Sequence, residues 1–247
     1  MNTPDTSVSG KAVSWQMFNR IAPTYDLLNT LLSGGCDARW RKKLYAELPA
    51  SPNKLRLLDM ATGTGEQLLA LLRRDEKINR RIDSAVGLDP AEGMLSVAQK
   101  KVACSESLPC KEIRFVCSDA CQTPFSDEEF HAITISFGIR NIPEPNRCLS
   151  EMLRLLKPGG RTLILEFSLP RNFFVRRFYL LYFRKILPFI GGVISGDSMA
   201  YRYLNQSVEE FPYDDAFLKL MRQAGFQNCR FQRLSLGIAN IYVGEKA

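Results

Sequence analysis

The chain has 247 residues and a formal net charge of +7, with 45% apolar and 24% charged residues. This length suffices for one α/β domain with a full core, and the composition is that of an ordinary globular protein. There is no run of 18 apolar residues and no leader with a basic start and an apolar run, so we expect neither a transmembrane span nor secretion. The charge permits an anionic partner, either nucleic acid or a lipid surface.

The seven cysteines and the single histidine form no metal motif. No two cysteines make a C-x-x-C pair, and four of them fall between Cys104 and Cys121 at spacings that do not match zinc sites. Reduced thiols in the cytoplasm are the favoured interpretation. Because His131 is the only histidine, a histidine-rich metal site is excluded and a Ser-His-Asp triad is implausible. We expect a structural role for it and no bound metal.

The first predicted elements are helices. Residues 1–13 are polar and expected to be loosely ordered. Apolar side chains then recur at three- and four-residue spacing over Ser14–Leu32, a helical pattern that Pro23 should break. A further helix is predicted over Asp37–Leu48, with its first residue as a suitable N-cap. Together they predict an N-terminal helical cap over residues 14–48.

Strands and helices then alternate to the end of the chain. The predicted strands are Leu55–Asp59, Ala85–Asp89, Ile113–Cys117, Ile133–Phe137, Thr162–Phe167, Asn228–Leu236 and Ala239–Gly244. Alternation of this kind predicts an α/β fold, a Rossmann-like, doubly wound and mostly parallel sheet of seven strands, with the last two antiparallel. We expect a single domain over residues 1–247, with a helical insertion at 170–206 before the last helix.

The stretch LRLLDMATGTGE, Leu55 to Glu66, reads as a buried strand, a glycine turn and the start of a helix. Such a junction is suited to a ligand, because Gly63 and Gly65 allow close approach to the backbone and the helix start offers free N–H groups. A dinucleotide fingerprint would require a third glycine, where this chain has Leu68.

Glu66 in this stretch and Asp89 after the next predicted strand indicate the kind of ligand. Glu66 would repel a pyrophosphate at the helix start, and the next strand-end acid, Asp89, comes thirty positions after Asp59. A nucleoside that carries an amino acid fits this loop better than one that carries two phosphates. The sequence therefore favours S-adenosylmethionine, against the alternative of a glycine turn with no ligand.

Polar residues fall at the ends of four predicted strands: Asp59, Asp89, Asp119 and Ser136. In open α/β sheets, ligands bind beyond the carboxyl ends of the strands. We therefore expect these four side chains to converge on one edge of the sheet.

Six segments together resemble a known family. They are FNRIAPTYDLLNTLLSGG, LLDMATGTGE, GLDPAEGML, ITISFGIRN, RLLKPGGRTLILEFSLP and YRYLNQSVEEFP. From Phe18 to its end the chain resembles the ubiquinone/menaquinone biosynthesis C-methyltransferases, a family of class I S-adenosylmethionine-dependent methyltransferases. SFGIRN and the Tyr-Asp segment are the more specific parts, since many methyltransferases share the glycine loop and the KPGG turn.

By matching position, the resemblance implies a cofactor site made by the glycine loop and the strand ends. Its residues are Asp59, Gly63, Thr64, Gly65, Asp89, Asp119, Ala120 and Ser136. The resemblance implies that the loop packs against the methionine part, that Asp89 accepts hydrogen bonds from the ribose hydroxyls, and that Asp119 accepts one from the adenine amine. Thr62 stands where relatives often have glycine. If that position requires a positive φ, the loop must differ locally.

The resemblance further implies methylation of a ring carbon of a prenylated quinol. Ionising a ring hydroxyl, whose pKa is about 10, would activate the adjacent carbon. Arg140 and Asn141 follow the fourth strand, where the substrate should lie. Since the pKa of arginine exceeds about 12, we expect Arg140 to stabilise the phenolate, while a water or Tyr25 and Asp26 handle the proton. A structural salt bridge is the alternative for Arg140.

The insertion contains a basic and aromatic segment, Arg171–Ile194, with five basic, no acidic and seven aromatic residues. On a helical wheel one side carries Arg176, Arg177 and Arg184, and the other carries Phe174, Phe178, Leu181 and Tyr182. This pattern fits peripheral binding at the inner face of an anionic membrane, where a prenylated quinol resides. A lid or a homodimer contact is the alternative.

Rival functions have weaker support. An RNA methyltransferase lacks its Asn-Pro-Pro-Tyr-like motif here, and no nucleic-acid module is evident. A nicotinamide oxidoreductase is disfavoured by the missing third glycine and by Glu66, and a non-enzymatic quinone-binding protein by the intact loop and Asp89. Another small aromatic acceptor remains an alternative. The sequence does not choose between a naphthoquinol and a benzoquinol.

Overall fold

The computed structural model describes residues 14–50, 54–78, 80–105, 108, 110, 112–182, 184 and 198–247. The expectation of loose order for residues 1–13 and the end of the basic, aromatic segment therefore lie outside the described residues. All structural statements below concern the described part of the chain.

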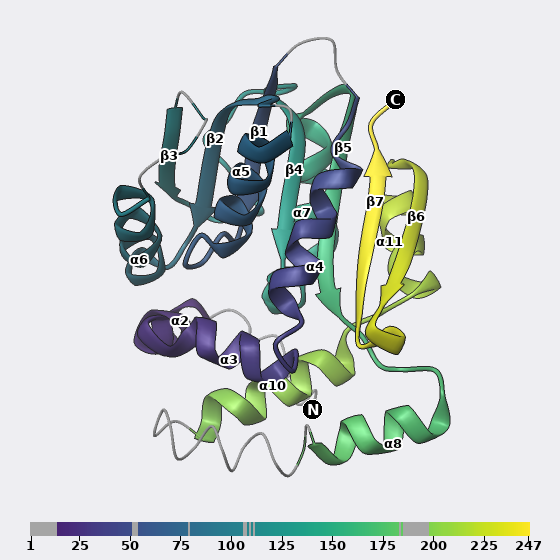
Figure 1. The fold of residues 1–247 in the computed structure, drawn as a ribbon. Helices are drawn as coiled ribbons and strands as arrows, with labels where there is room; N and C mark the ends of the chain where they lie inside the picture. Colours follow the sequence, from purple (N-terminus) through teal and green to yellow (C-terminus); the bar gives the residue numbers. More distant parts are fainter. Residues whose placement is uncertain are drawn as a thin grey trace, which may run out of the picture.

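Seven strands form one sheet in the order β3-β2-β1-β4-β5-β7-β6 (Figure 1). The strands are β1 (Leu55–Met60), β2 (Ile82–Asp89), β3 (Glu112–Cys117), β4 (Phe130–Ser136), β5 (Leu156–Phe167), β6 (Gln227–Leu234) and β7 (Ala239–Glu245). Neighbouring strands from β3 to β5 are parallel, while β7 runs antiparallel to β5 and β6. The predicted mostly parallel, doubly wound sheet of seven strands with a final antiparallel pair is confirmed.

The helices cover the two faces and one edge of this sheet. They are α2 (Ser14–Ile21), α3 (Tyr25–Leu32), α4 (Asp37–Lys43), α5 (Glu66–Ile78), α6 (Glu92–Ala103), α7 (Pro145–Leu155), α8 (Phe173–Leu181), α10 (Ser198–Glu210) and α11 (Asp215–Gln223). Short 3-10 turns are η1 (Ala22–Thr24), η2 (Leu44–Glu47), η3 (Ile139–Asn141) and η5 (Ser235–Gly237). As predicted, the first helical segment is broken at Pro23, which lies in η1.

Alternation along the strands builds two hydrophobic layers. In β1, Leu57 faces the layer that holds α4 and α5, and Leu58 faces the layer that holds α7 and α11. Figure 1 shows α4 and α5 on one face of the sheet and α7 and α11 on the other. Because both faces of the central strands are covered, these strands read in sequence as continuous apolar runs.

Two boundaries differ from the sequence prediction. The helix expected over Asp37–Leu48 ends as an α-helix at Lys43 and continues as η2, and its N-cap is Cys36 rather than Asp37. The predicted turn at 157–160 lies inside β5, which begins at Leu156. The turn forms an irregularity in which the pairing with β4 shifts, so that the strand continues through the glycines instead of starting after them.

The carboxyl edge of the parallel strands carries α2, α3, α8 and α10, which Figure 1 shows gathered below the sheet. Helix α8 exposes an apolar stripe, with Phe174 68% and Phe178 69% exposed. Its other side is anchored to the protein, because Tyr179 is buried and the Tyr182 hydroxyl donates to the Leu31 carbonyl at 2.7 Å. No helix among the described residues is long and apolar enough to cross a membrane.

Candidate active site

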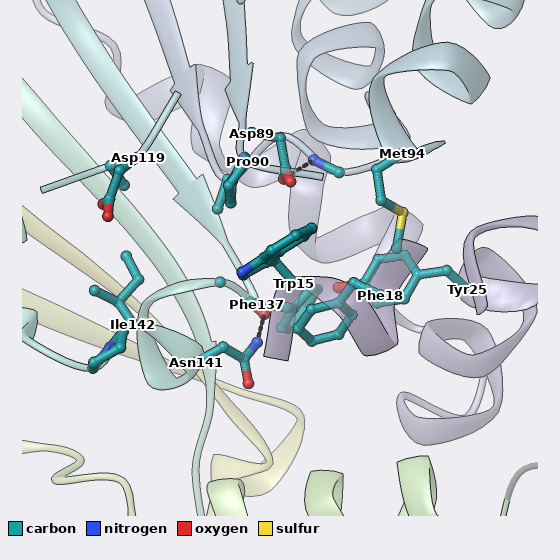
Figure 2. A pocket seen from close by; sticks show the side chains of 15 residues that line it. Trp15, Phe18, Tyr25, Asp89, Pro90, Met94, Asp119, Phe137, Asn141 and Ile142 are labelled. Carbon is teal, nitrogen blue, oxygen red and sulfur yellow. Dashed lines mark hydrogen bonds between the residues drawn. The ribbon is translucent and has the colours of Figure 1, made fainter. Parts of the chain in front are cut away.

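A pocket of about 240 Å³ opens at the carboxyl ends of β1, β2 and β4. It is lined by the glycine loop after β1, by Asp89 after β2, by Asp119 after β3, and by Phe137 and Asn141 after β4. Figure 2 shows the Trp15 ring between Asp89 and Asn141, with Phe18 and Tyr25 beside it. The predicted strand-end site thus has a cover made by α2 and α3.

The backbone of the glycine loop turns through left-handed conformations at Ala61 (φ 48°) and Gly63 (φ 56°). Thr62, between them, does not have a positive φ. Its hydroxyl donates to Asp59 Oδ2 at 2.7 Å. A β-branched residue is therefore compatible with this loop, and Thr62 links the loop to the end of β1.

Asp59 organises the loop from below and does not line the pocket. Besides the Thr62 hydroxyl, it accepts the Thr134 hydroxyl of β4 at 2.5 Å. Burial raises the pKa of Asp59 to about 6, although these two hydroxyl hydrogen bonds favour its charged form. Through these two hydrogen bonds Asp59 links the loop to the end of β4.

Asp89 holds two turns at once. Its Oδ2 accepts the N–H of Gly63 at 2.8 Å, and its Oδ1 accepts the N–H of Ala91 at 2.9 Å, at the start of α6. Burial raises its pKa to about 6. Since the carboxylate also lines the pocket, it remains available as an acceptor for a ligand hydroxyl.

The other expected cofactor residues divide into two groups. Asp119 and Ala120 line the pocket, and Asp119 Oδ1 accepts the N–H of Cys121 at 2.7 Å. Thr64 and Ser136 are buried and do not line it. The Ser136 hydroxyl instead donates to the Gln67 side-chain oxygen at 2.9 Å, which ties β4 to α5.

Asp26 fastens the N-terminal cap to the loop from outside the pocket. It accepts the Thr64 hydroxyl and the Lys101 ammonium, each at 2.5 Å. Lys101 Nζ also donates to Glu66 at 2.5 Å. Sequence reasoning missed Lys101, because nothing local marks a lysine on α6 as the partner of residues 35 and 75 positions away.

Tyr25 closes the pocket from the cap. Its ring packs edge-on against Phe18 with 5.7 Å between ring centroids, and it lies over Gly63, where an added Cβ would come within 3.7 Å of the ring. Burial raises the pKa of the Tyr25 hydroxyl, and the nearby charge of Arg140 opposes this shift. Tyr25 therefore keeps its proton near neutral pH.

Arg140 lies behind the pocket in a buried ion pair with Glu166, at the end of β5. Its Nη1 is 2.7 Å from Glu166 Oε1 and also donates to the Phe137 carbonyl at 2.6 Å, and both charged side chains are fully buried. Burial raises the pKa of Glu166, against the pull of Arg140. The Nε and Nη2 of Arg140 have no acceptor among the residues that the structure describes. Sequence reasoning missed Glu166, although a carboxylate in the apolar run of β5 was a visible signal.

Asn141 is the residue of this pair that reaches the pocket. Its Nδ2 donates to the Phe137 carbonyl at 3.3 Å, as Figure 2 shows. Its Oδ1 is buried without a hydrogen-bond partner. A buried acceptor left open in this way indicates a ligand that brings a donor.

No cluster of three or more potential metal ligands occurs among the described residues. His131, which we expected to be structural, accepts the N–H of Arg56 at its Nδ1, at 3.0 Å. Burial lowers its pKa, so the neutral ring that can accept this hydrogen bond is favoured.

The pocket fits S-adenosylmethionine on three structural grounds. The left-handed turns of the loop at Ala61 and Gly63 let a ligand approach the backbone closely. A buried carboxylate, Asp89, suits a diol, and the apolar lining with few polar groups is typical of a small-molecule site. The sequence argument from Glu66 against a phosphate is weaker in the structure, because Lys101 Nζ donates to Glu66 Oε1 at 2.5 Å.

Comparison with known proteins agrees with this geometry. The family model described as the ubiE/COQ5 methyltransferase family matches residues 6–246. A demethylmenaquinone methyltransferase of Thermus thermophilus is 44% identical over 230 residues, which is 93% of this chain and 100% of the relative. The ubiquinone/menaquinone biosynthesis C-methyltransferase UbiE of Geotalea daltonii is 43% identical over 94% of this chain and 95% of its own.

Solved structures share the fold at much lower identity. A SAM-dependent methyltransferase from Thermotoga maritima superposes with a TM-score of 0.64 at 20% identity, covering 94% of this chain and 99% of that one. A phosphoethanolamine N-methyltransferase of Haemonchus contortus, in complex with S-adenosyl-L-methionine, gives 0.57 at 13% identity over 84% and 52% of the two chains.

Proposed function

The chain belongs to the ubiE/COQ5 methyltransferase family, and we propose that its strand-end pocket serves the methylation of a ring carbon of a prenylated quinol. It is an S-adenosylmethionine-dependent C-methyltransferase of quinone biosynthesis. The proposed acceptor is demethylmenaquinol, the benzoquinol precursor of ubiquinol, or both. The observation that carries this site assignment is the convergence of the glycine loop, Asp89 and Asp119 on one mostly apolar pocket.

Within this proposal, each cofactor contact is assigned from the position of a group and from its remaining hydrogen-bonding capacity. Asp89 accepts the ribose hydroxyls, and Asp119 and Ala120 border the adenine. Gly63, Thr64 and Gly65 form the turn against the methionine part. The short approach of an added Cβ at Gly65 to Ala98, 3.0 Å, supports a glycine here for packing as well as for its φ of +78°. Asp59 and Ser136 act by holding the loop and α5 in place.

In this proposal, two parts of a single domain enclose the two ligands. The cap at residues 14–48 covers the cofactor, and the insertion at 170–206 receives the isoprenoid tail. Support for the first comes from the hydrogen bond of the Asn19 side chain to the N–H of Gly93 at 2.9 Å and from the Asp26–Lys101 ion pair. Support for the second comes from the position of α8 and α10 at the same edge of the sheet (Figure 1).

The chemistry needs an activated ring carbon. S-adenosylmethionine supplies the methyl group, and the acceptor carbon must carry electron density pushed from an ionised ring hydroxyl. A phenol has a pKa of about 10, so the site has to favour the phenolate. Two groups are open for this role: the free N–H donors of Arg140 and the unpartnered Oδ1 of Asn141, which can accept a ring hydroxyl.

Arg140 is proposed to act as a hydrogen-bond donor rather than as a free positive charge. Its charge is already compensated by Glu166 at 2.7 Å, yet its Nε and Nη2 can still donate to a phenolate oxygen. Water is the proposed proton acceptor. Tyr25 is unsuitable because burial raises its pKa, and both oxygens of Asp26 are engaged by Thr64 and Lys101.

This role of Arg140 can be tested by substitution. We expect Arg140→Lys to lower kcat by roughly 10²–10³-fold, because loss of a preorganised donor removes transition-state stabilisation, with binding of S-adenosylhomocysteine unchanged. Arg147→Lys, on the surface of α7, is the matched control. Near-normal turnover of both Arg140→Lys and Arg140→Ala, with cofactor binding intact, would refute the assignment.

The exposed stripe of α8 is proposed to contact the membrane that holds the acceptor. Phe173, Phe174, Phe178 and Leu181 are exposed together, and Arg176 and Arg177 are exposed beside them. Apolar side chains with neighbouring arginines fit the interface of an anionic bilayer. The proposal is therefore peripheral binding at the inner, cytoplasmic face of the membrane, with a homodimer contact as the competing use of the stripe.

Vesicle flotation distinguishes these two uses. Each phenylalanine buried in lipid contributes about 1.5–3 kcal/mol, so the double variant Phe174→Ala/Phe178→Ala should bind anionic vesicles roughly a hundredfold more weakly. Ile78→Ala, at the exposed end of α5, is the control. Unchanged flotation, together with a shift from dimer to monomer in light scattering, would assign the stripe to a protein contact.

The acceptor itself is tested with labelled S-adenosylmethionine and two chemically reduced substrates, a short-tailed demethylmenaquinol and its benzoquinol counterpart. Label in the naphthoquinol alone identifies a menaquinone enzyme, and label in both identifies a shared one. Label in neither, with cofactor binding measured by calorimetry, would retain the fold and overturn the quinol assignment.

A further inference from the structure

A second hollow, separate from the cofactor pocket, lies between α4 and α5. Its volume is about 320 Å³, which is within the range of small-molecule sites. Its charged lining is strongly one-sided, with five cations and one acid. The charged residues are Arg41, Lys42, Arg73, Arg74, Lys77 and Glu66. The quinol reaction described above uses none of the five cations.

The acid in this hollow does little to balance the cations. Glu66 Oε1 already accepts the Lys101 ammonium at 2.5 Å, which comes from outside the hollow. Among the described residues, Arg41 is the only one of the five cations that forms an ion pair with a carboxylate, and this pair is long, 3.8 Å from its Nε to Asp37 Oδ2. Among the described residues, positive charge therefore exceeds negative charge in this hollow.

Arg41 is the residue that indicates a ligand rather than a solvated surface. It is only 6% exposed, and its guanidinium donates no hydrogen bond to any described residue, so that its Nε is buried without an acceptor. A buried donor left unpaired is costly. Because Arg41 lines the hollow, an anion bound there would place a negative charge beside this under-compensated guanidinium. The guanidinium fork matches phosphate oxygens.

Arg41 also connects this hollow to the cofactor pocket. Its guanidinium carbon lies 5.1 Å from the centre of the Phe137 ring, which lines that pocket, and its carbonyl accepts the Gln67 side-chain N–H at 3.3 Å. The buried position of Arg41 is thus held by contacts other than ion pairing.

We propose that the hollow between α4 and α5 binds a small molecule that carries phosphate groups, held by Arg41 together with Lys42 and Arg74. Neither S-adenosylmethionine nor a neutral prenylated quinol has a phosphate, so this ligand is a third one. The phosphate comes from a soluble compound or from the headgroup of an anionic lipid. The inference does not rest on the identity of the methyl acceptor.

The test is titration calorimetry with inorganic pyrophosphate at fixed ionic strength. The pocket variant is Lys42→Gln/Arg74→Gln, and the control is Lys100→Gln/Lys219→Gln, which removes the same charge from α6 and α11. We expect the pocket variant to bind at least about tenfold more weakly than the wild type, and the control to bind as the wild type does. Unchanged binding of S-adenosylhomocysteine verifies that each variant is folded.

A second arm identifies the source of the phosphate. Neutral phosphatidylcholine vesicles and vesicles with added phosphatidylglycerol are compared in flotation, with α8 intact in every variant. If the wild type and the control bind pyrophosphate and the pocket variant does not, the ligand is assigned as a soluble phosphate compound. Loss of phosphatidylglycerol binding in that variant alone, without pyrophosphate binding by the wild type, assigns a lipid headgroup. Equal binding by the pocket variant and the control, or no binding of either probe by the wild type, overturns the proposal.

Discussion

Replacing Glu166 by glutamine should strongly destabilise the protein. The substitution keeps the shape and an oxygen that can accept the N–H of Phe167, now at 2.8 Å from Oε1, but it removes the negative charge. Arg140, 2.7 Å away, would then be a buried cation without a counter-charge, since both side chains are fully buried. Removing one partner of a buried pair costs about 3–5 kcal/mol of unfolding free energy.

The double variant Glu166→Gln/Arg140→Met tests the physical reason. With both charges gone, no unpaired ion remains, so we expect it to be more stable in urea unfolding than Glu166→Gln alone, despite carrying one more change. Calorimetry with S-adenosylhomocysteine checks that the loop is intact in each variant. A loss below about 1 kcal/mol for Glu166→Gln, or a double variant less stable than both single ones, would refute the reasoning.

Three further predictions concern the pocket. Burial raises the pKa of Asp89 to about 6, so its carboxyl group is protonated at pH 5 and ionised at pH 7.5. If the ionised group accepts the ribose hydroxyls, S-adenosylhomocysteine should bind roughly tenfold more weakly at pH 5 than at pH 7.5. In calorimetry, Asp89→Asn should abolish this pH dependence. The ionisation of Asp89 opposes folding, because a raised folded pKa makes the stability contribution fall as the pH rises from about 4 to 6. Thr62→Gly should cost about 1–3 kcal/mol in urea unfolding because it deletes a hydroxyl donor to a buried carboxylate, whereas Ala61→Gly, at φ 48°, should be neutral or stabilising. Lys101→Met removes the cation shared by the carboxylates of Asp26 and Glu66, which should loosen the N-terminal cap. Protease cleavage before β1 should therefore increase, while circular dichroism shows the sheet intact.

The sheet and the position of the pocket were predictable because their signals are local. Each central strand is an apolar run buried on both faces, and acids such as Asp59 and Asp89 stand directly at the strand ends. Parallel strands bring those ends together whatever the details of packing. The strand order β3-β2-β1-β4-β5 was not among the predictions, because right-handed crossovers fix the face on which each helix lies and not the order of the strands.

The direction of side chains on irregular segments was not predictable in the same way. The concern about Thr62 depended on a φ value that only the folded loop reveals, and the left-handed position is its neighbour Ala61. On α8, the helical wheel separated arginines from aromatic residues. It could not show that the side holding Phe174 and Phe178 faces away from the protein while Tyr179 is buried. Which stripe of an amphipathic helix is covered depends on tertiary contacts.

The ion pair with Glu166 changes what Arg140 can do chemically. From the sequence alone, a cation after β4 suggests direct electrostatic stabilisation of a phenolate. Glu166, 26 positions later on the next strand, cancels most of that field because the two groups lie together away from water. The hydrogen bonds that Arg140 can still donate depend on direction. Its Nε and Nη2, which have no acceptor among the described residues, can bond only an acceptor placed in line with their N–H groups. Under the proposed role, Arg140 would select the position of the ring oxygen more than its charge. Arg140→Lys keeps the charge and loses the fork, so it is the more informative substitution.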